Sequence, residues 1–159
     1  MSDRSELIEL HNRLSKTLDE ERGAAREKRY EKGYRTAREN LDDLVDKDSF
    51  VEYGQLAIAA QKSRRELEEL RTETAADGII TGFGKINSEI LDDKKALSAI
   101  IINDYSVLAG TQGYYHHKKL DRICETAEKQ NLPVVMYTEG GGGRPGDTDV
   151  HVQFAGLQI

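Results

Sequence analysis

Cysteine, tryptophan and proline are scarce in this chain of 159 residues, which has one cysteine, no tryptophan and two prolines. The single cysteine, Cys124, excludes a framework of disulfides within the chain and fits a reducing compartment. The formal net charge of −6 disfavours a nucleic-acid-binding surface. No apolar run approaches about 18 residues, so we expect no transmembrane helix and no membrane partner. The N-terminus has no basic stretch followed by an apolar one, which predicts no secretory signal and a cytoplasmic protein.

The first third of the chain is strongly charged and predicts helices. One narrow apolar stripe recurs at helical spacing within residues 1–32, and Gly33 is a plausible stop. The leucines of this stripe are Leu7, Leu10, Leu14 and Leu18. Thr36 and Glu39 have capping-box spacing, which predicts a second helix at 36–46. Residues 49–60 are expected to be extended, and residues 61–76 to form a solvated helix or a mobile loop.

The rest of the chain alternates between strand and helix patterns. Residues 77–87 predict a twisted strand or bulge, residues 91–95 a turn, and residues 97–104 a strand covered on both faces. Residues 113–130 predict a helix with Leu120, Ile123, Cys124 and Ala127 facing inward, and residues 132–137 another fully buried strand. A strand, a helix and a strand in this order predict a parallel pair and an α/β fold. The loops 104–113 and 138–149 then lie together at the ligand-binding edge of the sheet.

Four consecutive glycines, Gly140 to Gly143, follow the last apolar run and precede Arg144. Glycine is costly to order, so a run placed directly after a strand indicates that bare backbone approaches an anion or a developing oxyanion. A flexible linker is the alternative. The spacing Gly141-x-Gly143-x-x-Gly146 matches a dinucleotide-binding fingerprint only weakly, because Pro145 is atypical there and any glycine run produces such matches.

Three further candidates carry little chemistry by themselves. Adjacent histidines diverge by about 100° on a helix, so His116 and His117 predict a solvated helix start rather than a metal pair. Lys118 and Lys119 could meet a phosphate. Cys124 has no obvious activating partner and is interpreted as a core thiol. We therefore expect no metal and no catalytic role for these histidines or for the cysteine.

Several segments nevertheless resemble one family closely. These are TARENLDDLVDKDSFVEYG, DGIITGFGKIN, NDYSVLAGTQG and the stretch from HHKKLDRIC to GGGGRPGDTD. Across about residues 33–149 the chain is similar to the N-terminal part of the carboxyltransferase domain of biotin-dependent acyl-CoA carboxylases, of the propionyl-CoA, acetyl-CoA and long-chain acyl-CoA type. The resemblance implies a crotonase-like spiral sheet with flanking helices. It divides the chain into an N-terminal helical extension at 1–48 and a partial crotonase-like domain at 49–159.

The resemblance also implies a reaction. CO₂ moves from carboxylated biotin to the α-carbon of an acyl-CoA, and backbone N–H groups stabilise the thioester enolate. Biotin itself takes the α-proton, which fits the lack of a clear general base here. By this resemblance Gly141 and Gly142 are the oxyanion donors, and Gly140, Gly143 and Arg144 support the loop. The implied CoA-binding residues are Val107, Leu108, Ala109, Gly110, Thr111, Lys118 and Lys119.

The family's carboxyltransferase has two related halves, and the second half binds biotin. The sequence up to HVQFAGLQI matches the first half only, so the implied partners are the remaining half, a biotin carboxylase, a biotin carrier and further copies of the chain. The biotin would be carried on a separate domain or chain. Two functions stay open: part of an acyl-CoA carboxyltransferase, or a truncated module that binds acyl-CoA or a carboxylase subunit without catalysis.

Overall fold

A computed structural model describes residues 2–150, with the side chains from residue 4 onward. Its centre is a mixed sheet of four strands in the order β1-β2-β3-β4. The strands are β1 (Val51–Tyr53), β2 (Ile79–Lys85), β3 (Leu97–Asn103) and β4 (Val134–Tyr137). β2 runs antiparallel to both β1 and β3, and β4 runs parallel to β3, from Ala99 opposite Val134 to Ile102 opposite Tyr137. The predicted parallel pair is therefore confirmed.

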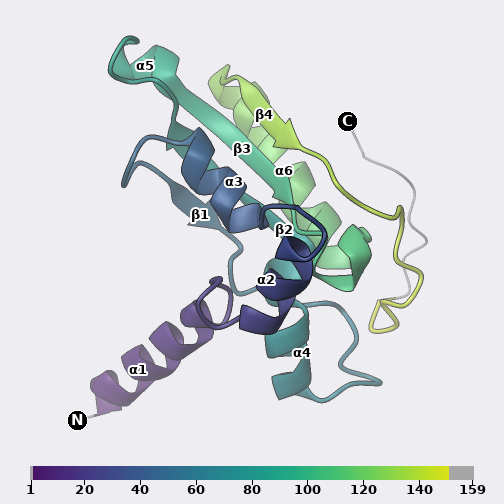
Figure 1. Ribbon diagram of the computed structural model, residues 1–159. Helices are drawn as coiled ribbons and strands as arrows, with labels where there is room; N and C mark the ends of the chain where they lie inside the picture. Colours follow the sequence, from purple (N-terminus) through teal and green to yellow (C-terminus); the bar gives the residue numbers. More distant parts are fainter. Residues whose placement is uncertain (1, 151–159) are drawn as a thin grey trace.

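Helices cover both faces of this sheet (Figure 1). Successive side chains of a strand point to opposite faces, so Ile100 and Ile102 pack toward α3 (Ala37–Leu44), and Ile101 packs toward α6 (Tyr114–Gln130). In α6 the predicted inward residues Leu120, Ile123 and Ala127 are buried. Cys124 is partly buried against the same cluster, as predicted for a core thiol.

The N-terminal region differs from its prediction. In place of one helix over 1–32, the chain forms α1 (Ser2–Ser15) and α2 (Gly23–Tyr30), separated by turns. The backbone N–H groups of Thr17 and Leu18 bond to carbonyls three residues back, and the Thr17 hydroxyl bonds to the Leu14 carbonyl, which ends the helix. Figure 1 shows α1 projecting away from the sheet, and its leucine stripe is packed only near the end of the helix: Leu7 and Leu10 are 52% and 41% exposed, and Leu14 is half-buried.

Other predicted elements are present with adjusted bounds. The Thr36 capping box is confirmed, and both of its hydrogen bonds are formed at the start of α3. Residues 49–60 contain only the short strand β1. Within 61–76 lie α4 (Leu67–Glu73), which buries Leu70, and the start of the 3-10 helix η1 (Ala75–Gly78). The turn over 91–95 runs into a short helix, α5 (Asp93–Ala96).

β4 is a strand as predicted, but the expectation that it is fully buried is wrong. Val134 and Met136 are 46% and 39% exposed, because β4 is the edge of the described sheet. Within residues 2–150, no helix is long and apolar enough to cross a membrane.

Candidate functional site

The two loops that follow β3 and β4 lie against each other, as predicted. Gly142 accepts a hydrogen bond from the N–H of Gln112 at 2.8 Å, and the N–H of Arg144 donates to the Gln112 carbonyl at 2.8 Å. The N–H of Gly141 donates to the Ala109 carbonyl at 3.1 Å. The glycine run is thus held by specific bonds to the neighbouring loop, unlike a flexible linker.

Gly110 and Gly140 bring the two backbones into direct contact. A Cβ added to Gly140 would lie 2.3 Å from the Gly110 carbonyl oxygen, and one added to Gly110 would lie 2.4 Å from the Glu139 carbonyl oxygen. Real Cβ atoms do not approach so closely. These two glycines are therefore required by loop-to-loop packing.

Gly142 is required for a different reason. Its φ is +92°, and a Cβ added there would meet no atom of the described residues within 4 Å, so these residues leave the space beside it open. Among the described residues no acceptor is assigned to its N–H, whereas the N–H of Gly141 is already bonded to Ala109. Of the two predicted oxyanion donors, Gly142 is thus the one whose N–H is available in this conformation.

A buried ion pair fixes the far side of the glycine loop. The Arg144 guanidinium contacts Asp77 of η1, and both side chains are almost fully buried. Arg144 also donates to the carbonyl oxygen of Thr111 at 2.7 Å and lies 3.5 Å from the Asp147 carboxylate. Burial raises the pKa of Asp77, against the opposing effect of the Arg144 charge. Arg144 thereby ties the loops after β3 and β4 to η1.

The same carboxylates cap the start of α6. Asp147 accepts from the N–H of Tyr114 at 2.7 Å, and Asp77 accepts from the N–H of His116 at 2.8 Å. Gly113, at the N-cap, has no side chain for this task. Negative charge at a helix N-terminus is stabilising, so the cluster joins α6 to the glycine loop.

The prediction of a solvated start for α6 is wrong for His116, which is fully buried. Its Nδ1 lies 3.2 Å from the Asp77 carbonyl oxygen, and its Nε2 has no partner in the described part of the chain. Burial lowers the pKa of His116 to about 4, so the ring is neutral at physiological pH.

The neighbouring lysines have opposite surroundings. Lys119 is 8% exposed and donates to the carbonyl oxygens of Ala76 and Ile79, and burial lowers its pKa to about 8. Its ammonium is occupied inside the fold and is not placed to reach a phosphate. Lys118 is exposed and lies over the Tyr114 ring, 5.6 Å from its centroid. Only Lys118 of this predicted pair is available to a ligand.

The basic helix α2 completes the site, a place that the charged helix predicted over 1–32 did not indicate. Arg22 pairs with Asp104 at 2.6 Å and donates to Ser106 at 3.0 Å. Arg29 binds both carboxylate oxygens of Glu139, at 2.6 and 2.8 Å. Each arginine thus holds one of the two loops. Asp104 comes just after β3 and Glu139 just after β4. These two acidic residues are the feature of the sequence that could have indicated a basic partner.

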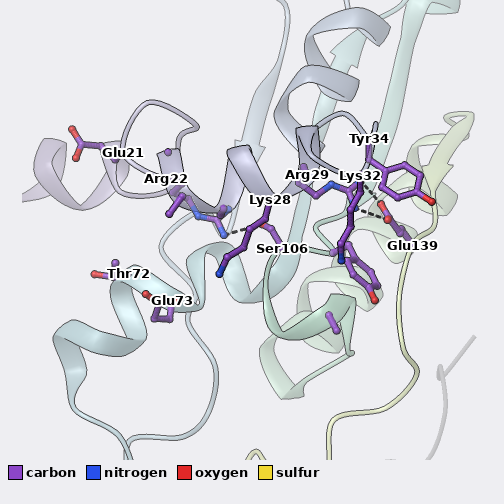
Figure 2. Close-up of a pocket in the computed structure, with 15 residues that line it drawn as sticks. Glu21, Arg22, Lys28, Arg29, Lys32, Tyr34, Thr72, Glu73, Ser106 and Glu139 are labelled. Carbon is purple, nitrogen blue, oxygen red and sulfur yellow. Dashed lines mark hydrogen bonds and ion pairs between the residues drawn. The ribbon is translucent and has the colours of Figure 1, made fainter.

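Between α2 and these loops lies a cavity of about 790 Å³ (Figure 2). Of the predicted segment 107–111 only Ala109 lines it, since Val107 is buried in the core and packs beside Gly78. The cavity's polar lining includes Arg22, Lys28, Arg29, Lys32, Tyr34, Tyr105, Ser106 and Glu139. Glu21 and Glu73 line it as well. Within the described residues, no group of three His, Cys, Asp or Glu side chains could hold a metal ion.

Comparisons with known proteins identify the family. A family model described as a carboxyl transferase domain matches residues 28–156. The chain belongs to this family. The matched region starts within α2 and includes both loops, η1 and α6.

Relatives with known roles support the same assignment. The chain is 34% identical over 139 residues to a biotin-dependent acetyl-/propionyl-coenzyme A carboxylase beta5 subunit from Mycobacterium leprae, covering 87% of this chain and 23% of that subunit. A propionyl-CoA carboxylase beta chain from Roseobacter denitrificans is 30% identical over 135 residues, covering 80% of this chain and 24% of the relative.

Solved structures agree. A single-chain, multi-domain long-chain acyl-CoA carboxylase superposes with a TM-score of 0.86 and 52% identity, covering 90% of this chain and 14% of that one. Transcarboxylase 12S, a hexamer with methylmalonyl-CoA bound, superposes with a TM-score of 0.63 and 27% identity, covering 79% and 22%. The chain spans less than a quarter of the length of each of these four proteins.

Proposed function

We propose that this chain is part of an acyl-CoA carboxyltransferase that moves CO₂ from carboxybiotin to the α-carbon of an acyl-CoA. The observation that carries the proposal is Gly142, whose N–H has no acceptor among the described residues and which belongs to a loop held by the buried ion pair of Arg144 with Asp77. Removal of an α-proton turns a thioester oxygen into an enolate oxygen. A fixed backbone donor stabilises that charge most in the transition state, and one such donor contributes roughly 2.7–4 kcal/mol.

The chain's own residues would bind and orient the acyl-CoA and stabilise its enolate. Gly142 donates to the thioester oxygen, and Gly141 becomes a second donor if Ala109 releases its N–H. Gly140 and Gly143 shape the loop, and Arg144 anchors it from inside the fold. Because the loop is already fixed by Gln112, Asp77 and Thr111, little reorganisation is needed when the enolate forms.

The acyl-CoA would lie in the cavity beside Ala109, the one residue of the segment 107–111 that lines it. Lys118, on the exposed side of α6, remains a candidate for a phosphate contact. Carboxylated biotin, brought by a separate domain or chain, supplies the CO₂ and accepts the α-proton. The open space at Gly142, where an added Cβ meets no atom of the described residues within 4 Å, leaves room for this second reactant.

The family supports a proposal for the wider assembly. We propose a crotonase-like fold whose other half lies outside this chain, with residues 1–48 as its N-terminal extension, although α3 already packs Leu41 on the sheet. The partners would be that half, a biotin carboxylase and a biotin carrier, in a homo-oligomer. The free thiol of Cys124 fits a cytoplasmic location.

The test separates catalysis from binding alone. The 159-residue chain is titrated with propionyl-CoA by calorimetry, and a complete carboxylase carrying this segment is assayed for carboxylation by mass spectrometry. We expect binding in the first and turnover in the second. Binding without any turnover in the complete protein would favour the non-catalytic module, and absence of both binding and turnover would refute the proposed function.

A further inference from the structure

The turn that carries Asp77 has an unusual backbone. Ala76, Asp77 and Gly78 have φ angles of +51°, +51° and +73°, so three residues in succession are left-handed. Residues with a side chain rarely adopt this conformation, and such a turn persists only where its surroundings hold it. η1 therefore needs contacts from other elements that fix its shape.

Those contacts come from one side of α6. The ammonium of Lys119 donates to the carbonyl oxygen of Ala76 at 2.9 Å and to that of Ile79, so it joins the two ends of the turn. One helical turn earlier, the backbone N–H of His116 donates to the Asp77 carboxylate at 2.8 Å. α6 thus holds the left-handed turn at its ends and at its centre.

A lysine is an unexpected residue for this task, because burying an ammonium is costly. Both acceptors of Lys119 are neutral carbonyl oxygens, which offset the lost hydration less than a carboxylate would. Gly54 lies against the side chain, and a Cβ added there would be 3.0 Å from three carbons of the Lys119 stem. A methionine would fill the same space without burying a charge. The buried nitrogen therefore indicates a task for its hydrogen bonds.

The left-handed turn in its turn holds both loops of the site. The Asp77 carboxylate contacts the buried guanidinium of Arg144, two residues beyond Gly142. The Gly78 carbonyl accepts the N–H of Asp104 at 2.9 Å, at the start of the loop after β3. A displacement of this turn would therefore move the glycine loop and its neighbour together.

We infer that Lys119 is a positioning residue for carboxyl transfer, because it fixes the turn from which Asp77 holds the glycine loop. Its ammonium is enclosed within the fold and acts on the Gly142 N–H through Asp77 and Arg144. The inference rests on the proposed function, since it concerns the same oxyanion donor. A displaced donor would still allow acyl-CoA to bind but would stabilise the enolate less.

Lys119→Met tests the inference, since methionine fills the space of the stem and has no N–H to donate. Leu41→Ala is the matched control, because it weakens the core on the other face of the sheet. In a complete carboxylase carrying this segment, we expect Lys119→Met to lower kcat about tenfold and to change KM by less than about twofold. Leu41→Ala should leave both unchanged. Steady-state kinetics with varied acyl-CoA measures them, on protein that circular dichroism shows to be folded.

Amide hydrogen exchange in the 159-residue chain gives a readout that does not depend on turnover. We expect Lys119→Met to accelerate exchange at residues 76–80 and 138–146 more than in the rest of the sheet, and Leu41→Ala to show no such preference. Asp77→Asn, which weakens the contact with Arg144, should accelerate exchange at 138–146. Adding Lys119→Met to Asp77→Asn should have little further effect on the glycine loop, because both changes break one series of contacts.

Two results would overturn the inference and leave the proposed function standing. One is an unchanged kcat in Lys119→Met of an active carboxylase, and the other is exchange at 138–146 that rises no more than in Leu41→Ala. If Lys119→Met does not fold, Lys119→Gln takes its place: glutamine is one bond shorter and cannot reach both carbonyls, so the same selective losses are expected. An inactive parent carboxylase would refute the proposed function, while the exchange measurements would still decide whether Lys119 holds the loop.

Discussion

At the scale of single residues, Gly142 is the position on which catalysis should depend most. Its φ of +92° strains any side chain, and a branched one would also occupy the open space where the thioester oxygen is proposed to lie. In a complete carboxylase carrying this segment, we expect Gly142→Val to lower kcat at least about a hundredfold, the scale of one lost oxyanion donor. KM should change much less, and steady-state kinetics with varied acyl-CoA measures both.

Gly143→Ala is the control for that variant. An added Cβ at Gly143 also meets no atom within 4 Å, and Gly143 has no positive φ, so kcat should stay close to that of the parent. A normal kcat with a raised KM in Gly142→Val would mean that the loop contributes to substrate binding and donates no hydrogen bond to the enolate.

Gly140 should instead matter for stability. In Gly140→Ala the new methyl group would lie 2.3 Å from the Gly110 backbone, which has no flexible side chain to move aside. We expect the free energy of unfolding to fall by about 1–3 kcal/mol, the usual cost of overpacking. Urea unfolding of the 159-residue chain measures it, with Gly143→Ala as the matched variant. A change below about 0.5 kcal/mol would show that the two loops separate easily.

The glycine run illustrates what can be read from residues alone. Its position after an apolar run predicts a loop beside residues 104–113 at the carboxyl end of the parallel strands, and the structure places it there. The glycine composition does not distinguish Gly140, which makes room for Gly110, from Gly142, which adopts a positive φ. Close backbone packing and a positive φ both require glycine, so the two roles look the same in the sequence. Asp77 was missed for a similar reason: its importance comes from Arg144, which is 67 residues away along the chain.

At the scale of elements, the unexpected result is the role of α2. Periodicity predicted the helical state of this segment but not its place, because Lys28 and Arg29 of the helix and Arg22 at its N-cap find partners far away in the sequence or line a cavity. The strands β2 and β3 and the helix α6 were predictable, since continuous apolar runs and a helical apolar face determine them locally. The exposure of β4 was not predictable, because its apolar sequence does not reveal how many elements cover it.

Arg29→Lys tests how firmly α2 holds the glycine loop. A lysine keeps the charge but cannot bind both Glu139 oxygens, which lie 2.6 and 2.8 Å from the guanidinium nitrogens. We expect faster amide hydrogen exchange in residues 138–143 and a loss of about 1–2 kcal/mol in unfolding free energy. Arg35→Lys is the control, because the Arg35–Asp43 pair is at the exposed surface and contributes little. Equal exchange in both variants would show that Glu139 does not hold the loop.

At the scale of the whole molecule, His116 should make stability depend on pH. Burial lowers its pKa from 6.5 to about 4, so the folded chain binds fewer protons than the unfolded chain between these values. The contribution is complete above the unfolded value and is lost as the pH falls toward 4. We expect a loss of about 2 kcal/mol between pH 7 and pH 5 from this group.

Urea unfolding at several pH values measures that slope. His116→Asn keeps a donor for the Asp77 carbonyl but cannot titrate, so its stability should be lower at neutral pH and depend less on pH. His11→Asn, at an exposed position of α1, is the matched variant. An unchanged slope in His116→Asn would show that the ring is hydrated or protonated inside the fold.

The contrast between Lys118 and Lys119 also has a chemical consequence. An amine-reactive ester must reach a lysine's nitrogen as well as find it deprotonated, and the Lys119 nitrogen is enclosed by carbonyl oxygens of Ala76 and Ile79. A brief labelling of the native chain should therefore acylate Lys118 and spare its neighbour, and unfolding should make the two equally reactive. The ratio of the two labelled forms, read by peptide mass spectrometry, would then report how often the loop at η1 opens.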